Sequence, residues 1–388
     1  YFKFLNMRKI KIIPLLSTVY KTAIIYPVSG NITFSWNLGV SAGIMLAAQI
    51  VTGLFLAMHY IPESEMAFDS VRHIVVDVNN GLVIRSLHAN GSSLFFFITY
   101  LHLFRGLYYG SYASPRRHVW LSGVVILLLM IVTAFLGYVL PWGQMSYWAA
   151  TVITNIIAIV PIVGKDALMV IWGNYSVSNA TLQRFFALHF LLPFVILFAV
   201  GGHIIALHEH GSSNPSIGIR HFDNLTFHPF FIFKDIFTTM ILLYAYNYYA
   251  MEHAPEIIDP DNYVKANPLS TPAHIVPEWY FKMFYAILRS VPNKEFGAFL
   301  LLASILVLFI FPYITKSGLK DSSQRFYHQL YFWLFFSDFW LLTWLGEKPI
   351  DEPFVSLGQA CTGYYFLYFL VILPWIAKRE RRFLRLSK

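Results

Sequence analysis

The chain has 388 residues, of which 57% are hydrophobic, 18% are aromatic and only 12% are charged. Soluble domains carry roughly 25% charged residues, so this composition excludes an ordinary soluble protein and is typical of a polytopic membrane protein. The single cysteine, Cys361, excludes an internal disulfide and a cysteine-rich metal site.

Eight apolar stretches, each about twenty residues long, predict membrane-spanning helices. The basic residues 1–31 before the first stretch are expected to lie on the membrane surface. The eight helices are expected at 32–58, 82–108, 119–139, 181–207, 230–250, 296–315, 326–346 and 355–377. The sequence therefore predicts an all-α integral membrane protein with eight transmembrane helices.

Two long connections, 140–179 and 251–295, are not simply polar, and short amphipathic helices on the membrane surface would explain both. Lys and Arg are concentrated at the two termini and in alternate connections. By the positive-inside rule, both termini then face the cytoplasm or the mitochondrial matrix. The net charge of +8 is thus a topology signal, and it gives no reason to expect nucleic-acid binding.

Four histidines stand in two of the predicted helices: His88 and His102 in the second, and His189 and His203 in the fourth. Within each pair the spacing is fourteen residues. On an α-helix this interval advances ~21 Å and turns ~40° short of four full turns, so both members look out from nearly one face at two depths. Two such helices side by side would offer two facing His–His pairs. That geometry suits two non-covalent, bis-histidine haems.

Glycines repeat the same interval in the first and third predicted helices, at Gly39 and Gly53 and at Gly123 and Gly137. A flat macrocycle needs room where it passes a neighbouring helix, and a residue without a side chain supplies that room. The alternative is ordinary small-residue packing between membrane helices. The shared interval favours a four-helix haem-binding bundle over 32–210, in which the second and fourth helices ligate.

Arginines lie outward from the histidines. Arg85 precedes His88 by three residues, Arg105 follows His102 by three, and Arg184 precedes the second pair by five. A guanidinium at these places could pair with the anionic propionates of a haem. The alternative is an arginine whose charged head merely reaches the membrane surface. Two stacked haems would carry electrons across the bilayer, which requires a donor at one face and an acceptor at the other.

Two further places carry side chains suited to proton transfer. Glu278 stands beside aromatic residues in the sequence PEWY, where an apolar setting can raise its pKa and let it take a proton from a hydroxyl substrate. On the basic side, His208 follows the last of the four histidines, and Lys234 and Asp235 open the fifth predicted helix. Taken alone, each of these groups could equally be a helix cap or a surface residue.

Several motifs together resemble cytochrome b, the family of haem-bearing subunits of ubiquinol–cytochrome c reductase, respiratory complex III. The motifs are GYVLPWGQMSYW at 137–148, TLQRFFALHF at 181–190, DPDNY at 259–263 and PEWYFKMFYAILRSVPNK at 277–294. The resemblance implies that His88 and His189 ligate a low-potential haem near the intermembrane side. It likewise implies that His102 and His203 ligate a high-potential haem near the matrix side.

The resemblance also implies roles at both ends of the haem chain, in a protonmotive Q cycle that oxidises ubiquinol on one side and reduces ubiquinone on the other. The implied residues are Glu278, Tyr138, Tyr280 and Tyr285 for quinol oxidation, His208, Lys234 and Asp235 for quinone reduction, and Arg85, Arg105, Trp36 and Ser111 around the haem propionates.

The implied partners are the Rieske iron–sulfur protein, cytochrome c1 and other complex III subunits, within a homodimeric complex that binds lipids such as cardiolipin. The implied location is the mitochondrial inner membrane. The expected organisation is a surface segment at 1–31, the haem-binding bundle at 32–210 and a C-terminal four-helix domain with the PEWY loop at 211–388.

Two alternatives are weaker. The related plastid quinol–plastocyanin oxidoreductase has a counterpart that is split after four helices, with a second histidine pair one residue wider than the interval seen here. An ion-coupled transporter could use membrane histidines and acids, but it would not require the glycine interval or the PEWY sequence.

Overall fold

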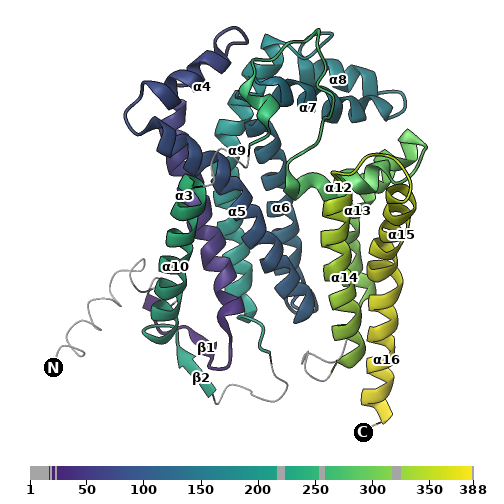
Figure 1. Cartoon of the computed structure of the whole chain (residues 1–388). Helices are drawn as coiled ribbons and strands as arrows, with labels where there is room; N and C mark the ends of the chain where they lie inside the picture. The colour runs from purple at the N-terminus through teal and green to yellow at the C-terminus, as the bar shows by residue number, and fades with distance from the viewer. Residues whose placement is uncertain are drawn as a thin grey trace, which may run out of the picture.

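The structure is a computed structural model, and it describes residues 17, 20, 21, 24–215, 223–252, 258–316 and 325–386. The expected surface segment therefore lies largely outside the described residues. Each of the eight predicted stretches contains one long helix (Figure 1). They are α3 (Leu38–Ala57, after the 3-10 turn η1, Phe34–Asn37), α5 (Gly81–Tyr108), α6 (Arg117–Val139), α9 (Asn179–His210), α10 (Phe230–Glu252), α13 (Lys294–Ile314), α14 (Phe326–Leu345), and α15 (Phe354–Leu367) continued by the π turn η6 (Tyr368–Ile372) into α16 (Leu373–Leu386).

Five of these helical segments are long and apolar enough, by length and composition, to cross a membrane. They are Phe34–Ala57, Arg117–Val139, Asn179–His210, Lys294–Ile314 and Phe354–Arg382. α5 has 28 residues, but its two histidines, two arginines and several small polar residues lower its hydropathy. α10 and α14 are rich in tyrosine and tryptophan, which prefer the membrane–water interface. The polar side chains of the candidate site thus explain why α5 falls short of the hydropathy of a membrane span.

Short helices occupy the two long connections, as predicted. α7 (Gln144–Asn155), η2 (Ile156–Ile159) and α8 (Gly164–Trp172) follow α6, while η4 (Pro260–Tyr263) and α12 (Trp279–Arg289) precede α13. A further short helix, α4 (Ala67–Val76), was not predicted. α4, α7 and α8 lie at the same end of the long helices, at the top of Figure 1.

The fold is mostly helical, as predicted, and a small sheet that was not predicted lies at the opposite end. β1 (Pro27–Ser29) pairs antiparallel with β2 (Asn224–Thr226), with Val28 opposite Leu225. Strands of three residues carry no usable hydrophobic period, so their pairing could not be read from the sequence. The end of α16 lies at this same end of the molecule (Figure 1).

The long helices pack in two groups. In the first, α3 packs on α5, α6 packs on α9, and α10 packs on both α5 and α3. In the second, α12 packs on α13 and α14, and α14 packs on α15. Contacts of α6 with α13 and of α5 with α14 join the two groups. The expected boundary at residue 210 assigns α10 to the C-terminal half, whereas its packing partners α3 and α5 belong to the N-terminal half.

Candidate functional site

The structure brings the four histidines together as two facing pairs. The imidazole rings of His88 and His189 have centroids 6.2 Å apart, and those of His102 and His203 are 6.5 Å apart. A metal–imidazole bond is about 2.0–2.1 Å long and the ring centre lies ~1.1 Å behind the bonding nitrogen, so a shared metal ion requires centroids roughly 6.3 Å apart. Both pairs match that requirement.

The donor set at each level is a pair of imidazoles. Among the residues that the structure describes, no three His, Cys, Asp or Glu side chains gather as a metal site. Zinc sites built by protein alone use three or four protein ligands. A haem brings four nitrogens of its own and takes only its axial ligands from the protein. Two facing histidines at each of two depths therefore fit two bis-histidine haems.

Neighbouring helices hold the outer nitrogen, Nδ1, of three of these histidines. The Thr52 hydroxyl already donates to the Ala48 carbonyl and the Ser122 hydroxyl to the Val119 carbonyl, so each of these oxygens accepts from an imidazole N–H. Such a bond leaves the inner nitrogen, Nε2, free to bind a metal. The three contacts are His88 Nδ1 to Thr52 Oγ1 at 3.0 Å, His189 Nδ1 to the Thr133 carbonyl at 2.8 Å, and His203 Nδ1 to Ser122 Oγ at 2.8 Å.

His102 differs from the other three because Arg105 Nη2 lies 3.3 Å from its Nδ1. A guanidinium can only donate, so this contact places the imidazole proton on the inner nitrogen. Arg105 Nε is also buried, and it has no hydrogen-bond partner in the described part of the chain. An anion beside Arg105, such as a haem propionate, would satisfy Nε and draw the guanidinium away from His102.

Arg105 belongs to a polar cluster at the end of α5. Its guanidinium lies 5.3 Å from the centre of the Trp36 ring. Trp36 Nε1 donates to the Ser213 carbonyl at 2.9 Å, and the hydroxyl of Ser111 lies 2.9 Å from that of Ser213. Trp36, Arg105 and Ser111 are thus brought together as the resemblance implied. Ser213 joins them from the loop after α9, and no spacing in the sequence pointed to it.

Each of the four interval glycines faces one histidine. In the structure these glycines lie against the edge of an imidazole ring, and the room that they would leave for a macrocycle stays a prediction. The α3 glycines face α5 histidines, and the α6 glycines face α9 histidines. A Cβ would lie 3.4 Å from His102 Cε1 at Gly39, 3.3 Å from His203 Cε1 at Gly123 and 2.9 Å from His88 Cε1 at Gly53, and it would overlap the His189 ring at Gly137.

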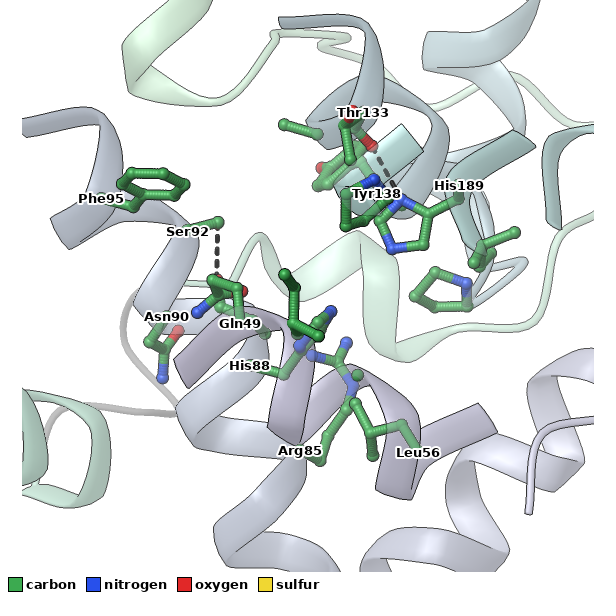
Figure 2. A pocket seen from close by; sticks show the side chains of 18 of the residues that line it. Gln49, Leu56, Arg85, His88, Asn90, Ser92, Phe95, Thr133, Tyr138 and His189 are labelled. Atoms are coloured by element: carbon green, nitrogen blue, oxygen red, sulfur yellow. Dashed lines mark hydrogen bonds between the residues drawn. The ribbon is translucent and has the colours of Figure 1, made fainter. Parts of the chain in front are cut away.

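A cavity of about 230 Å³ lies beside the first histidine pair (Figure 2). In Figure 2, Arg85 and His88 reach it from α5, while Thr133, Tyr138 and His189 reach it from α6 and α9. Further lining residues are Gly53, Gly137, Glu278 and Tyr280. One cavity therefore joins the candidate metal ligands to the candidate proton acceptor.

Glu278 is the residue immediately before α12, and it lines this cavity. Burial raises the pKa of its carboxyl to about 7, against the opposing pull of Lys282; Asp259 adds to the rise and Arg85 opposes it. A carboxyl with a pKa near neutrality is ionised in about half of the molecules at pH 7. Glu278 can therefore take up and release a proton under ordinary conditions.

α5 also holds the turn that carries Glu278. The hydroxyl of Tyr100 donates to the Tyr280 carbonyl at 2.6 Å, and Phe96 stacks on the Tyr280 ring with centroids 4.2 Å apart and planes 2° apart. Both side chains stand on the helix that carries His88. The candidate metal ligand and the PEWY turn are therefore fixed to one rigid element.

Replacing Tyr100 by phenylalanine is expected to cost about 1 kcal/mol of stability and to loosen the start of α12, because the ring stays but the hydrogen bond is lost. Tyr365→Phe is the matched control, since that equally buried hydroxyl donates to the Ser304 carbonyl of α13 at 2.7 Å and forms no hydrogen bond to α12 in the described part of the chain. Amide hydrogen exchange over 278–289 should accelerate only in Tyr100→Phe. Equal exchange in both variants would contradict the anchoring role of Tyr100.

Two residues proposed from the sequence lie elsewhere. Arg184 is exposed, and its Nη1 donates to the Val170 carbonyl near the end of α8 at 2.9 Å. Five residues turn a helix by ~140°, so Arg184 and His189 occupy different faces of α9. Tyr285 is not among the residues that line the cavity; the Arg289 guanidinium lies 5.0 Å from its ring centre.

The residues expected at the other quinone site lie around the loop before α3. The His208 ring stacks on Tyr26 with centroids 4.4 Å apart. Lys234 Nζ donates to the Ile32 carbonyl at 2.7 Å, and Asp235 stands beside it, half-buried, in the first turns of α10. The structure thus gathers these groups at one end of the helix bundle. Tyr26 is an additional member that sequence reasoning missed.

The chain is similar to known proteins of one family over nearly its whole length. The family model described as "Cytochrome b/b6/petB" matches residues 23–211, and "Cytochrome b(C-terminal)/b6/petD" matches residues 265–366. The chain is 52% identical to cytochrome b of Acanthamoeba castellanii, covering 95% of this chain and 97% of that protein. It is 49% identical to cytochrome b of the bacterium Rickettsia prowazekii (strain Madrid E), covering 92% and 90%. A solved structure, "Hyperthermophilic respiratory Complex III", aligns with a TM-score of 0.89 and 34% identity over 96% of this chain and 99% of that one.

Proposed function

This chain belongs to the cytochrome b family, and from that membership we propose that it is the subunit of a respiratory complex III that moves electrons between quinones across a membrane. Its place in a complex III-like oxidoreductase follows from the family and from the structural match. The finer elements of the proposal are two b haems, a quinol-oxidation site, a quinone-reduction site and eight membrane spans.

The observation that carries the proposal is the spacing of the facing imidazoles, 6.2 Å at one level and 6.5 Å at the other. His88 and His189 would hold one b haem, and His102 and His203 the other. When bound, the two haems supply a path for single electrons through the bilayer. The chain itself fixes the ligand rings through their outer nitrogens, and Arg85 and Arg105 would neutralise the propionates.

Quinol oxidation is proposed for the cavity beside His88 and His189. Loss of two electrons from a quinol requires its hydroxyl protons to leave, and Glu278 is the buried carboxyl that would accept one of them. Tyr138 and Tyr280 line the same space and would orient the quinol ring. The Rieske iron–sulfur protein and cytochrome c1 are the proposed electron-accepting partners on this side.

Quinone reduction is proposed for the opposite end of the bundle. His208 and Asp235 would deliver protons to the carbonyl oxygens of ubiquinone, and Lys234 would stabilise the negative charge that develops there. The contacts of His208 with Tyr26 and of Lys234 with Ile32 support a site closed by the loop before α3. Tyr285 and Arg184 receive no direct role in this proposal.

The proposed setting is the mitochondrial inner membrane, with eight spans and both termini on the matrix side. Basic residues near the chain ends support this orientation. Bacterial relatives make a bacterial cytoplasmic membrane the alternative setting. A homodimeric complex with bound lipids such as cardiolipin, and the division at 31 and 210, complete the proposal.

A reduced-minus-oxidised spectrum of the purified protein tests the haem assignment, and quinol-dependent cytochrome c reduction in native membranes tests the activity. We expect two b-type haems per chain that differ in midpoint potential. An ion-coupled transporter would show no such band. Absence of a b-haem band from protein that carries all four histidines would remove the proposed function.

A further inference from the structure

The ion pair between Lys282 and Glu347, near Glu278, has no role in the function proposed above. Glu278 immediately precedes α12 and Lys282 is the fourth residue of that helix, so the lysine stands in the first turn of α12, within reach of the Glu278 carboxyl as a charge. Lys282 Nζ lies 2.7 Å from Glu347 Oε2, in the loop after α14. The Lys282 side chain is 16% exposed and the Glu347 side chain 52% exposed. The lysine is therefore the inner member of the pair and the glutamate the outer one.

The backbone holds this pair in place. Gly346, next to Glu347, lies so close to α12 that a Cβ there would overlap the carbonyl of Lys282. At the far end of α12, Arg289 donates to the carbonyls of Leu345 and Lys348. The loop that carries Glu347 is thus tied to both ends of α12. Lys282 consequently keeps a fixed position relative to Glu278.

Burial has the largest effect on the pKa of the Glu278 carboxyl, and the charge of Lys282 has the next largest. Glu347 is held ionised by its hydrogen bond from Lys282, which lowers the pKa of that carboxyl, so it offsets part of the lysine charge. The other charges that act on Glu278 are Asp259 in the preceding loop and Arg85 on α5. The charge of Glu278 in turn acts on the titratable hydroxyls that face it, those of Tyr138 on α6, Tyr249 on α10 and Tyr280 on α12. Lys282 differs from Asp259 and Arg85 in forming, within the described part of the chain, an ion pair with a half-exposed carboxylate.

We propose that the Lys282–Glu347 pair sets the pH range over which Glu278 accepts a proton, Lys282 directly and Glu347 by partly neutralising Lys282. This inference rests on the proposed role of Glu278 in quinol oxidation. Lys282 and Glu347 act through Glu278 and are positioning residues for its charge. The two members of the pair push the titration of Glu278 in opposite directions, which makes their effects separable.

Lys282→Met removes a positive charge that favours the ionised carboxyl, so the pH midpoint of quinol oxidation should rise by about one unit. Glu347→Gln leaves Lys282 unopposed, so the midpoint should fall, and by less because Glu347 is half exposed and screened by solvent and salt. The double variant should behave like Lys282→Met, because Glu347 acts only through the lysine. Lys282→Arg keeps the charge and should retain the native profile.

The experiment uses the intact complex in native membranes and measures two quantities for each variant. The first is the pH profile of quinol-dependent cytochrome c reduction. The second is the protonation of Glu278, followed by its carboxyl C=O infrared band and assigned by its loss in Glu278→Gln. Lys265→Met is the matched control, since Lys265 also forms an ion pair, with Asp69 at 3.0 Å, but does not contribute to the pKa of Glu278.

Opposite shifts of the carboxyl titration in Lys282→Met and Glu347→Gln, with none in Lys265→Met, would support the inference. An unmoved titration in both variants, or a shift in the same direction, would overturn it. A third result would be a shifted titration of the Glu278 carboxyl with an unchanged pH profile of the rate. In that case the ion pair does set the protonation of Glu278, but Glu278 does not act in quinol oxidation. The two proposals can therefore fail separately.

Discussion

Gly137→Ala is expected to abolish haem binding between His88 and His189 and to reduce quinol oxidation to background. The added Cβ would overlap the His189 ring, which can move aside only by giving up its hydrogen bond to the Thr133 carbonyl. Gly123→Ala is the matched control, because its Cβ would meet His203 Cε1 at 3.3 Å, a contact that a shift of a few tenths of an ångström relieves. Spectra should show one b haem per chain for Gly137→Ala and two for Gly123→Ala.

Helix weakening cannot produce that difference. Alanine is a better helix former than glycine by about 1 kcal/mol in a helix interior, so both substitutions favour α6 itself. A loss of haem confined to Gly137→Ala would then arise from the crowded imidazole alone. Two haems of native intensity in Gly137→Ala would contradict the role assigned to this glycine.

Glu278→Gln is expected to lower quinol oxidation by roughly 10²–10⁴-fold while both haems stay in place, because glutamine cannot accept a proton. In the native protein burial raises the pKa of Glu278 to about 7. Below that pH the carboxyl is protonated and cannot act as a base, so the native rate should climb as pH rises through about 7. The residual rate of Glu278→Gln should lack this step.

The measurement is the pH dependence of quinol-dependent cytochrome c reduction in native membranes, normalised to haem content. Glu295→Gln, at an exposed carboxyl in the first turn of α13, serves as the control and should leave rate and profile unchanged. Native turnover in Glu278→Gln would take Glu278 out of the proposed reaction.

The positions of the long helices were predictable because each contains a long stretch of apolar and aromatic residues, and that signal is local. The helical period placed the two histidines of each helix on one face once the interval was known, and the facing of the two helices was a hypothesis built on it. The glycines carried the same interval, although their contact with the imidazole edge required the packing of α3 on α5 and of α6 on α9.

Other features depend on contacts between segments far apart in the chain. Lys282 and Glu347 are 65 positions apart, and β1 and β2 are joined only through the folded chain. Ser213 reaches the Trp36 cluster from a loop without any periodic pattern. Arg184 was placed by its distance along the sequence, but the turn of α9 points it elsewhere. A periodic pattern specifies a helix face, and the neighbour that this face meets is fixed by tertiary packing.

The length of α5 between His88 and His102 has an electrical consequence. Fourteen residues span ~21 Å, about two thirds of a hydrocarbon core ~30 Å thick. Moving a unit charge across a whole membrane changes its electrostatic energy by about 2.3 kcal/mol per 100 mV. A charge that moves between the two histidine levels would therefore change its energy by roughly 1.5 kcal/mol per 100 mV. Since 1.4 kcal/mol is a factor of about ten in an equilibrium, ~100 mV of transmembrane voltage would redistribute electrons between the two levels about tenfold. With the proposed haems at both levels, the spacing of two histidines on one helix would make electron transfer between them respond to the membrane voltage.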